Sequence, residues 1–425
     1  MVIRRSLPML VDFTVSNFGP FKDPVTLSMQ ASSSKYMEEN VIEVEQISGG
    51  LLSSAVVFGS NASGKTYLMK ALNALVSMVA RPHPDGSGIL WYQPFRLDRE
   101  SISSPVEMRI RIIESSILYD YSLSFDAVSI VRESLYHYPN GRRACVFDRT
   151  GSLEYRKSRK AFSKVTPAGS TYLAVASGFN DGTCNTVRRA LTEGFIFLYS
   201  DLDALVAESC DFAERDPDAR RLIVEGLRIA DFGIEDYTFS EVQRSLESIQ
   251  GYIPPKVFEE LQRGGYRGRE WKVSIKHGFR QSDIDEDRRV FPMEIESAGT
   301  RCMLGLLGPL VDALNGGKVL LIDELGSHLH PLITRWIIEQ FSRDYNPRHA
   351  QLVANSHDIS LMDNDDDVLR RDQMWFTNKD SGNGVSDLYS MDDFTGLRRE
   401  ANPLKAYLFG KFEAIPEIAS RGVIR

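Results

Sequence analysis

Apolar and polar positions alternate along one stretch of the chain, from residue 106 to about residue 155. A period of two predicts antiparallel β-strands that bury one face. Asn140 and Gly141 fall between two such runs and predict a hairpin turn with positive φ. Two short strands are also expected near the start, at 9–18 and 24–30. The strands expected in the alternating stretch are residues 106–112, 118–125, 130–138 and 144–147.

The pattern becomes helical between about residues 186 and 263. Strands are expected again at 271–275 and 290–295, so this region predicts a helical insertion that ends in β-structure. The apolar faces of the expected helices lie at residues 202–206, 221–229 and 257–261.

The last third of the chain restores an α/β pattern. Short, continuously apolar runs at 318–322 and 351–354 are typical of buried parallel strands. A helix around residues 332–341 separates them, and one more strand is expected at 375–377. The sequence therefore predicts a parallel α/β core that an antiparallel β-lobe and a helical insertion interrupt.

A glycine-rich loop follows an apolar strand at residues 55–59 and precedes a helix expected over 67–79. Its spacing matches the phosphate-binding pattern G-x-x-x-x-G-K-S/T, in which backbone N–H groups and a helix start bind phosphate oxygens. The pattern arises by chance in roughly 1–2% of chains of this length, and the strand and helix around it favour the functional interpretation. The loop consists of Gly59, Ser60, Asn61, Ala62, Ser63, Gly64, Lys65 and Thr66. Lys65 would reach the β- and γ-phosphates, and the Thr66 hydroxyl would ligate Mg²⁺.

Two carboxylates end the apolar strand at 318–322. Asp323 would support the hydration shell of Mg²⁺, and Glu324 would orient and polarise an attacking water. A strand that merely ends in solvated acids is the alternative. The presence of Lys65 elsewhere in the chain favours the catalytic interpretation.

Two further segments could contact a bound anion. Ser297, or the amides of residues 297–300, could present donors at a helix start, although a simple N-cap is the alternative. His357 follows the strand at 351–354 and could donate to a γ-phosphate or to water, whereas a buried structural histidine is the alternative. His328 and His330 resemble metal ligands but have no supporting third ligand nearby, so we expect them in a loop at a subunit contact.

Composition changes this picture little. The chain of 425 residues is 42% hydrophobic and 25% charged, with a net charge of −8, which argues against a uniformly basic nucleic-acid binder. Cysteines are scattered without a CxxC pair, which favours a reducing compartment. There is no signal-like segment and no apolar run near 18 residues, so we expect a cytoplasmic protein that neither spans nor binds a membrane.

The order of these motifs resembles the ABC-type ATPase head of the SMC, RecF and OLD-like group. The loop at 59–66 is similar to that group's G-x-N-x-S-G-K-S/T, residues 296–301 to its E-S-x-G-T signature, and residues 355–358 to its switch-histidine loop. Asn17 and Phe18 match an N-terminal "NF" turn. More narrowly, the chain resembles stand-alone ATPases of bacterial antiphage and abortive-infection systems, of RloA type with AriA and PtuA as relatives. Similar stretches near the C-terminus are residues 371–376, 388–390 and 407–416.

The resemblance implies one ATP and Mg²⁺ held between two subunits. Lys65, Thr66, Asp323, Glu324 and His357 would act from one copy. The other copy would contribute the signature residues Ser297, Gly299 and Thr300. It further implies a homo-oligomer, a dimer or higher, that controls a separate effector such as a nuclease.

Some positions differ from the family pattern. Gly19 follows the "NF" turn where a basic residue is frequent, and Gly326 and His330 occupy a neighbourhood where relatives often carry an aspartate. The glutamine of the Q-loop, a further Mg²⁺ ligand in the family, is assigned here to Gln93.

The predicted fold class is α/β, a P-loop ATPase head with an antiparallel β-lobe and a helical insertion lobe. A RecF-like ATPase that binds DNA in repair or maintenance is the alternative function, and a nucleotide-dependent scaffold is a third. A solvated acidic loop is expected at 363–367. The basic residues that could contact DNA are Arg156, Lys157, Arg159, Lys160, Arg263, Arg267 and Arg269. The predicted domains are 1–175 with the phosphate loop and β-lobe, 176–290 as the insertion, 291–380 as the second half of the core, and 381–425 as a tail for packing or partner contact.

Overall fold

The computed structural model divides the chain into two compact units. The first contains Met1–Tyr199 and Ala313–Arg425, and the second contains Ser200–Asp312. The residues that the structure describes are 8–83, 86, 88–151, 154–156, 160–230, 233–244, 246, 258, 262, 268–278, 289–363, 368–394 and 402–415.

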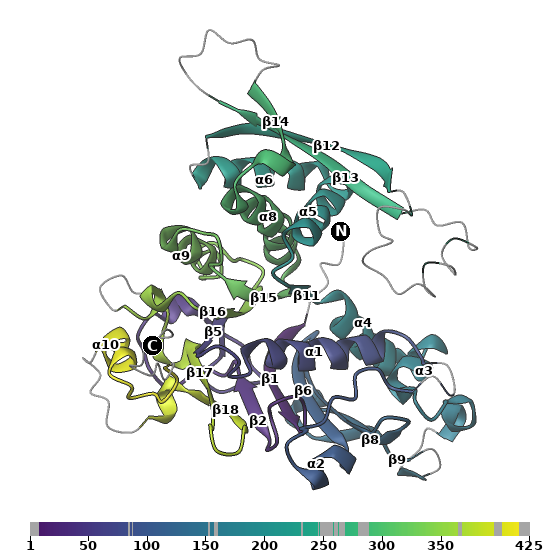
Figure 1. The fold of residues 1–425 in the computed structure, drawn as a ribbon. Helices are drawn as coiled ribbons and strands as arrows, with labels where there is room; N and C mark the ends of the chain where they lie inside the picture. The colour runs from purple at the N-terminus through teal and green to yellow at the C-terminus, as the bar shows by residue number, and fades with distance from the viewer. Residues whose placement is uncertain are drawn as a thin grey trace, which may run out of the picture. The chain divides into compact units, whose positions relative to one another are not determined.

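A six-stranded sheet forms the centre of the first unit (Figure 1). Its first five strands are parallel, and the last pairs antiparallel with its neighbour. Every residue of the two central strands is buried, as expected where both faces of a sheet are covered. In spatial order the strands are β11 (Phe195–Leu198), β15 (Val319–Leu325), β16 (Gln351–Ser356), β5 (Ser54–Gly59), β17 (Met374–Lys379) and β18 (Ser386–Ser390).

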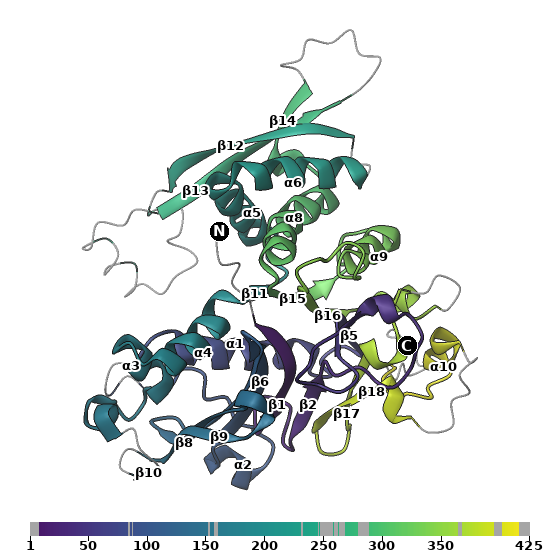
Figure 2. The same ribbon diagram turned by 180° about the vertical axis from the view of Figure 1, so that it is seen from behind.

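A seven-stranded antiparallel sheet belongs to the same unit, and Figure 2 shows most of its strands side by side. It contains the strands of the predicted β-lobe and, in addition, the two strands predicted near the start of the chain. Val106, Met108 and Ile110 are buried whereas Glu107 and Arg109 between them are exposed, so the alternation in sequence sets one face toward the core. The hairpin turn is confirmed, with φ of 53° at Asn140 and 72° at Gly141. In spatial order the strands are β10 (Glu154–Arg156), β9 (Ala144–Thr150), β8 (Ile130–His137), β7 (Ile117–Phe125), β6 (Val106–Glu114), β1 (Met9–Ser16) and β2 (Val25–Ser28).

Helix α1 (Lys65–Ala80) shares one hydrophobic core with both sheets. Leu68 and Leu72 of the helix belong to the same buried cluster as Val57 of β5 and Phe13 of β1. The helix that follows the glycine-rich loop is thereby fixed against two layers of strands. The unit also contains the short strands β3 (Val41–Ile42) and β4 (Leu51–Leu52) and the helices α2 (Arg99–Ser103), α3 (Tyr172–Gly178), α4 (Gly182–Glu193), α9 (Pro331–Glu339) and α10 (Pro403–Leu408).

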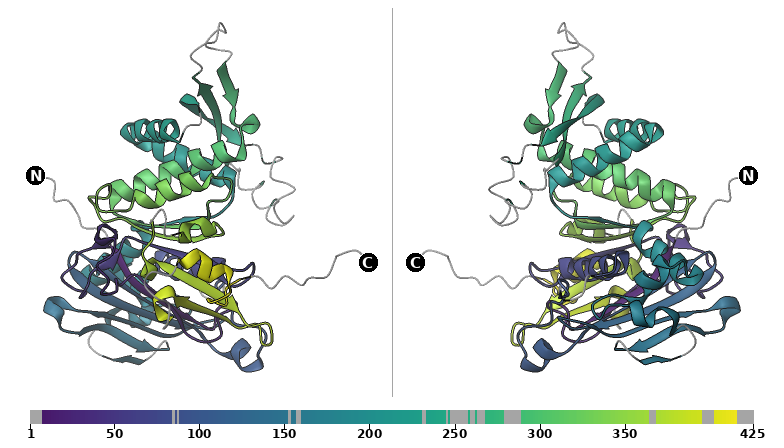
Figure 3. Two further views of the ribbon diagram at one scale, coloured as in Figure 1. Left: turned by 90° about the vertical axis from the view of Figure 1, so that its left-hand side faces the viewer. Right: turned by 90° about the vertical axis from the view of Figure 1, so that its right-hand side faces the viewer.

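The second unit packs helices on one side of a three-stranded antiparallel sheet (Figures 1 and 3). Tyr237, Val273 and Ile275 are buried on that side of the sheet. A Cβ added at Gly305 would lie 2.6 Å from the Leu205 Cβ, so a glycine is needed where two of the helices meet. The elements are α5 (Leu202–Arg215), α6 (Pro217–Ile229), β12 (Ile234–Arg244), β13 (Gly268–His277), β14 (Val290–Pro292) and α8 (Ala298–Gly316), which begins in this unit.

The structure confirms the α/β class and most predicted strands, but the region predicted as helical also contains strands. Phe195–Leu198 is β11 of the central sheet, and Ile234–Arg244 is β12. A four-residue apolar strand cannot be distinguished from a buried helical turn by periodicity. The helix expected at 257–261 lies largely outside the described residues.

The observed units begin and end at other residues than the predicted domains. The predicted insertion includes residues 176–199, which belong to the first unit, and the predicted second half of the core includes residues 291–312, which belong to the second. The predicted tail, 381–425, includes β18, and the ring of Phe412 stacks on Phe376 of β17 with centroids 4.5 Å apart. Its described part therefore extends the core. Across the described residues, no helix is both long and apolar enough to cross a membrane.

Candidate functional site

The glycine-rich loop connects β5 to α1 and is held by bonds to its own backbone and to β17. The Lys65 Nζ donates to the carbonyls of Gly59, at 2.8 Å, and Ser60, at 2.9 Å. The Ser63 and Thr377 hydroxyl oxygens lie 2.6 Å apart. A Cβ at Gly59 would lie 2.4 Å from the Thr377 carbonyl oxygen, so the loop and β17 approach closely only because residue 59 is glycine. The loop is thus preformed.

Lys65 carries a perturbed ammonium group. Burial lowers the pKa of Lys65 to about 8, although the Asp323 and Glu324 carboxylates act in the opposite direction. A polyanion beside this side chain would favour its charged form. The loop therefore provides a cation whose charge a bound phosphate would stabilise.

Three elements converge on the Asp323 carboxylate at the end of β15. The Thr66 hydroxyl at the start of α1 donates to Asp323 Oδ1 at 3.0 Å, and the Asn355 amide at the end of β16 donates to the same oxygen. The Asn355 side-chain oxygen in turn accepts from the Glu324 N–H at 2.8 Å. Asn355 therefore fixes both residues of the predicted acidic pair relative to each other.

Glu324 has an unusual backbone, with φ of 62°. The pairing of β15 with β16 is irregular between Ile322 and Leu325, which turns the Glu324 side chain outward into an exposed position while Asp323 stays buried. The turn places the Glu324 carboxylate in the wall of a cavity and leaves the Asp323 carboxylate buried beneath it. Thr66 and Asp323 together offer a hydroxyl and a carboxylate oxygen, the ligand types that Mg²⁺ prefers.

His357 follows β16 and lines the same cavity as Glu324. Burial, and then the charge of Lys65, hold the pKa of His357 below its ordinary value, while Glu324 and Asp323 act to raise it. The imidazole is therefore mostly neutral at pH 7, with one nitrogen able to donate and one able to accept a hydrogen bond.

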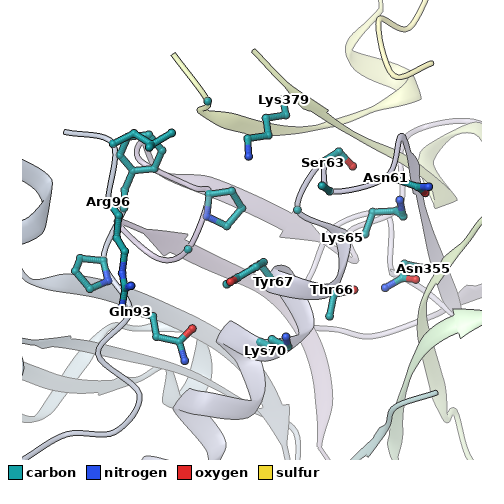
Figure 4. Close-up of a pocket in the computed structure, with 18 of the residues that line it drawn as sticks. Asn61, Ser63, Lys65, Thr66, Tyr67, Lys70, Gln93, Arg96, Asn355 and Lys379 are labelled. Atoms are coloured by element: carbon teal, nitrogen blue, oxygen red, sulfur yellow. The ribbon is translucent and has the colours of Figure 1, made fainter. Parts of the chain in front are cut away.

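A cavity of about 1080 Å³ is lined by Lys65, Thr66, Glu324, Asn355 and His357 but not by Asp323, and every described residue that lines it belongs to the first unit. Figure 4 shows Lys65, Thr66 and Asn355 at one end, and Gln93 and Arg96 at the other, with Tyr67 between them. The Gln93 carbonyl accepts from the Gly19 N–H at 2.7 Å. No described contact joins Gln93 to Thr66 or Asp323, so its role as an Mg²⁺ ligand stays a prediction.

Sequence reasoning missed several residues that line this cavity. Lys70 lies one helical turn after Thr66, and its Nζ is 5.2 Å from the centre of the Tyr67 ring. The spacing of Thr66 and Lys70 on one helix face could have indicated this position. Arg96 and Lys379 also line the cavity, but they come from a loop and a strand end that no local motif connects to the phosphate loop.

The signature residues lie at the start of α8 in the second unit. Ser297 Oγ accepts from the Thr300 N–H at 3.1 Å and lies 2.9 Å from Thr300 Oγ1, with Gly299 in the turn between them. Ser297 thus serves as an N-cap. Contact of Ser297, Gly299 and Thr300 with a nucleotide stays a prediction.

The remaining candidates have structural roles or fall outside the described residues. His330 caps α9, where its Nδ1 accepts from the Leu332 N–H at 3.2 Å, and His328 has φ of 66° in the preceding loop. Their place at a subunit contact stays a prediction. The side chains of the proposed DNA-contacting residues lie outside the described part of the chain, and so do Asp365, Asp366 and Asp367 of the predicted acidic loop.

Several solved structures are similar to this chain. Among solved structures, the chain is similar to the SMC head domain from Thermotoga maritima, with 12% identity, a TM-score of 0.40, and coverage of 90% of this chain and 98% of that one. It is also similar to an SMC head domain from Pyrococcus furiosus in complex with the C-terminal domain of ScpA, with 12% identity, a TM-score of 0.38, and coverage of 96% and 100%. For the recombination mediator protein RecF (RecF-ATPrS), identity is 11%, the TM-score is 0.37, and coverage is 91% and 99%. At these identities and TM-scores, individual residues of these structures are not matched to residues of this chain.

A search of curated proteins gives no match. The family model described as "AAA domain, putative AbiEii toxin, Type IV TA system" matches residues 54–172 and 230–363, more than half of the chain. The matched ranges include the glycine-rich loop, the signature residues, Asp323 with Glu324, and His357. The chain belongs to this family of AAA-domain proteins.

Proposed function

We propose that this protein binds and hydrolyses ATP with Mg²⁺ and that the nucleotide acts as a conformational switch. The observation that carries the proposal is the hydrogen-bonded set of Thr66, Asp323 and Asn355, which joins the phosphate loop to the acidic pair. A hydroxyl, a carboxylate, a buried lysine and an outward-facing glutamate converge there at the end of a parallel sheet. This combination suits phosphoryl transfer to water.

Each residue has a distinct role in the proposed reaction. The loop amides and Lys65 would bind the triphosphate, and Thr66 and Asp323 would hold Mg²⁺, which supplies charge neutralisation on the β- and γ-phosphates. Glu324 would accept a hydrogen bond from the attacking water, and the neutral His357 would donate to the γ-phosphate. Asn355 would keep the Glu324 backbone in place.

The ATP site is proposed to be completed by a second copy of the chain. The phosphate loop belongs to one compact unit and the signature to the other, and the signature's helix start can present Ser297, Gly299 and Thr300 to a γ-phosphate. ATP would then join two copies and hydrolysis would release them. Turnover in such a site controls assembly rather than metabolism.

The proposed setting is bacterial antiphage defence by abortive infection. The family description names a toxin of a toxin–antitoxin system, and the sequence resembles stand-alone antiphage ATPases of RloA type. In this setting the ATP-dependent assembly would restrain or activate a separate effector, such as a nuclease. A Glu324→Gln protein assembled on ATP would be the bait that captures this effector.

ATP affinity and phosphate release, measured together, test the enzymatic part of the proposal. Glu324→Gln should bind ATP with Mg²⁺ as tightly as the wild type while releasing phosphate at least about 100-fold more slowly, because only the transition state needs the carboxylate. Lys65→Ala should lose binding itself. Wild-type protein that binds no ATP, or a Glu324→Gln protein that hydrolyses at the wild-type rate, would refute this assignment.

A further inference from the structure

We infer that His277 and Glu296 form a positioning pair that holds the signature loop in place and keeps the Glu296 carboxylate away from the γ-phosphate. The inference rests on the proposed function, since it concerns the half of the ATP site that the signature supplies. Neither residue is assigned to contact ATP.

The geometry of Glu296 is the first observation. Glu296 directly precedes Ser297, and its Oε1 lies 2.8 Å from His277 Nε2. The side chains of His277 and Glu296 are only 13% and 9% exposed. The Glu296 N–H also donates to the Met293 carbonyl at 3.1 Å. Both the backbone and the side chain of the residue before the signature serine are therefore fixed.

His277 is itself held by the sheet of the second unit. It is the last residue of β13, opposite Ile234 of β12, and its ring centre is 5.2 Å from that of Phe291 on β14. The imidazole thus links the three strands to the start of α8 through its contact with Glu296. A change in the sheet would be transmitted directly to the signature loop.

Charge explains why such a pair is needed. A carboxylate one residue from a group that contacts the γ-phosphate would repel the negatively charged triphosphate unless it is turned away or neutralised. The bond to His277 turns it away. Without this bond, rotation about the side-chain torsions of Glu296 would bring negative charge toward the site.

A second tether ties the same loop to α5, but it is more exposed. Arg301 in the first turn of α8 forms an ion pair with Asp203, whose side chain is 86% exposed. Solvent and salt weaken exposed pairs of this kind. The mostly buried His277–Glu296 pair is therefore the stronger constraint, and Asp203→Asn provides a matched control at the other tether.

The ATP-concentration dependence of phosphate release tests the pair. His277→Ala should raise the KM for ATP about tenfold, equivalent to about 1.4 kcal/mol, with a smaller change in kcat. His277→Gln retains an N–H donor and should restore much of the loss. The double variant His277→Ala with Glu296→Gln should also recover, because the charge that repels ATP is gone. Asp203→Asn should change KM less than about threefold.

Two results would overturn the inference. If His277→Ala has the wild-type KM for ATP, the His277–Glu296 pair is not needed to position the signature loop. If His277→Ala raises KM but neither His277→Gln nor the double variant recovers, the histidine contributes packing alone. Thermal melting of each variant separates these results from a general loss of folding.

Mixing of variant proteins distinguishes failure of this inference from failure of the composite site. Lys65→Ala retains its signature and Ser297→Arg retains its phosphate loop, so a mixture of the two should recover activity if the site is shared between copies. His277→Ala should be restored by Lys65→Ala but not by Ser297→Arg. No recovery in the first mixture contradicts the composite site. If the first mixture recovers activity but the mixture of His277→Ala with Lys65→Ala does not, the composite site stands and only the positioning role of His277 is contradicted.

Discussion

The two halves of the proposed ATP site are built in different ways. In the first unit, Thr66, Asp323 and Asn355 come from three separate elements and are joined by side-chain hydrogen bonds at the end of one parallel sheet. In the second unit, Ser297 bonds to Thr300, three residues further along the same helix start. The first half is preorganised by the fold of the sheet, whereas the second depends on a local cap and on its tethers. Substitutions in the first half should therefore abolish ATP hydrolysis, and substitutions in the second half should weaken the ATP-dependent assembly of two copies.

The largest effect is expected at Lys65. Lys65→Ala removes the buried ammonium that contacts two loop carbonyls and that would face the triphosphate. Phosphate release should fall to background, and ATP should no longer alter the mass of the protein. Fluorescent-nucleotide titration and phosphate release check this expectation, and ordinary turnover by the variant would contradict it.

The next effect is expected at Asn355, which sequence analysis placed only within the histidine motif. Asn355→Ala removes a donor from Asp323 and the acceptor of the Glu324 N–H, so kcat should fall on the order of 100-fold, because small displacements of reacting groups have effects of that size. Stability should fall by about 1–3 kcal/mol, the cost of an unpaired buried polar group.

Asn346 provides the matched control for Asn355. It is also a buried asparagine, with side-chain bonds to the backbone of Phe341 and Ala350. Asn346→Ala should lower the melting temperature similarly and leave kcat within about threefold of the wild type. Equal losses of rate in both variants would mean that Asn355 acts on stability alone.

A smaller, pH-dependent effect is expected from Lys65 in the wild-type protein. Burial lowers the pKa of Lys65 to about 8 in the free protein, so above pH 8 most molecules carry a neutral amine. ATP favours the charged form, and binding must then take up a proton. The apparent Kd should rise as pH rises through 8, about tenfold by pH 9. Calorimetry in buffers of different ionisation enthalpy should find close to one proton taken up at pH 9, and no uptake there would contradict the argument.

The smallest effect is expected at the cap of α8. Ser297→Ala should cost about 1 kcal/mol of stability and weaken ATP-dependent assembly several-fold. Asp216, the N-cap of α6 in the same unit, accepts from the Asp218 N–H at 3.0 Å and offers a control. Asp216→Ala should cost similar stability without a change in assembly. If both variants assemble like the wild type, Ser297 is a structural cap only.

Much of the fold could be predicted because the chain's local signals agree with its tertiary structure. Residues 106–112 alternate clearly, and Val56, Val57 and Phe58 form a continuous apolar strand before the glycine-rich loop. The glycine and lysine spacing of that loop is imposed by phosphate geometry, so it is recognisable without any neighbours. The acidic pair near the end of β15 could be identified because it directly follows a continuous apolar run.

The missed features depend on contacts between distant parts of the chain. β11 is a strand because Phe195 pairs with Val319, more than a hundred residues away, and no local pattern indicates this partner. Arg96 and Lys379 reach the cavity because the loop before α2 and the end of β17 meet there. The unit boundary at Ser200 likewise follows from packing and has no signal in composition.

The mass of Glu324→Gln by light scattering, with and without ATP and Mg²⁺, tests the central claim most directly. The account predicts a monomer mass without nucleotide and at least a doubled mass with ATP and Mg²⁺, which persists because hydrolysis is blocked. The Lys65→Ala change in the same background should abolish the shift. A Glu324→Gln protein that binds ATP tightly but keeps the same mass would contradict a site shared between two copies.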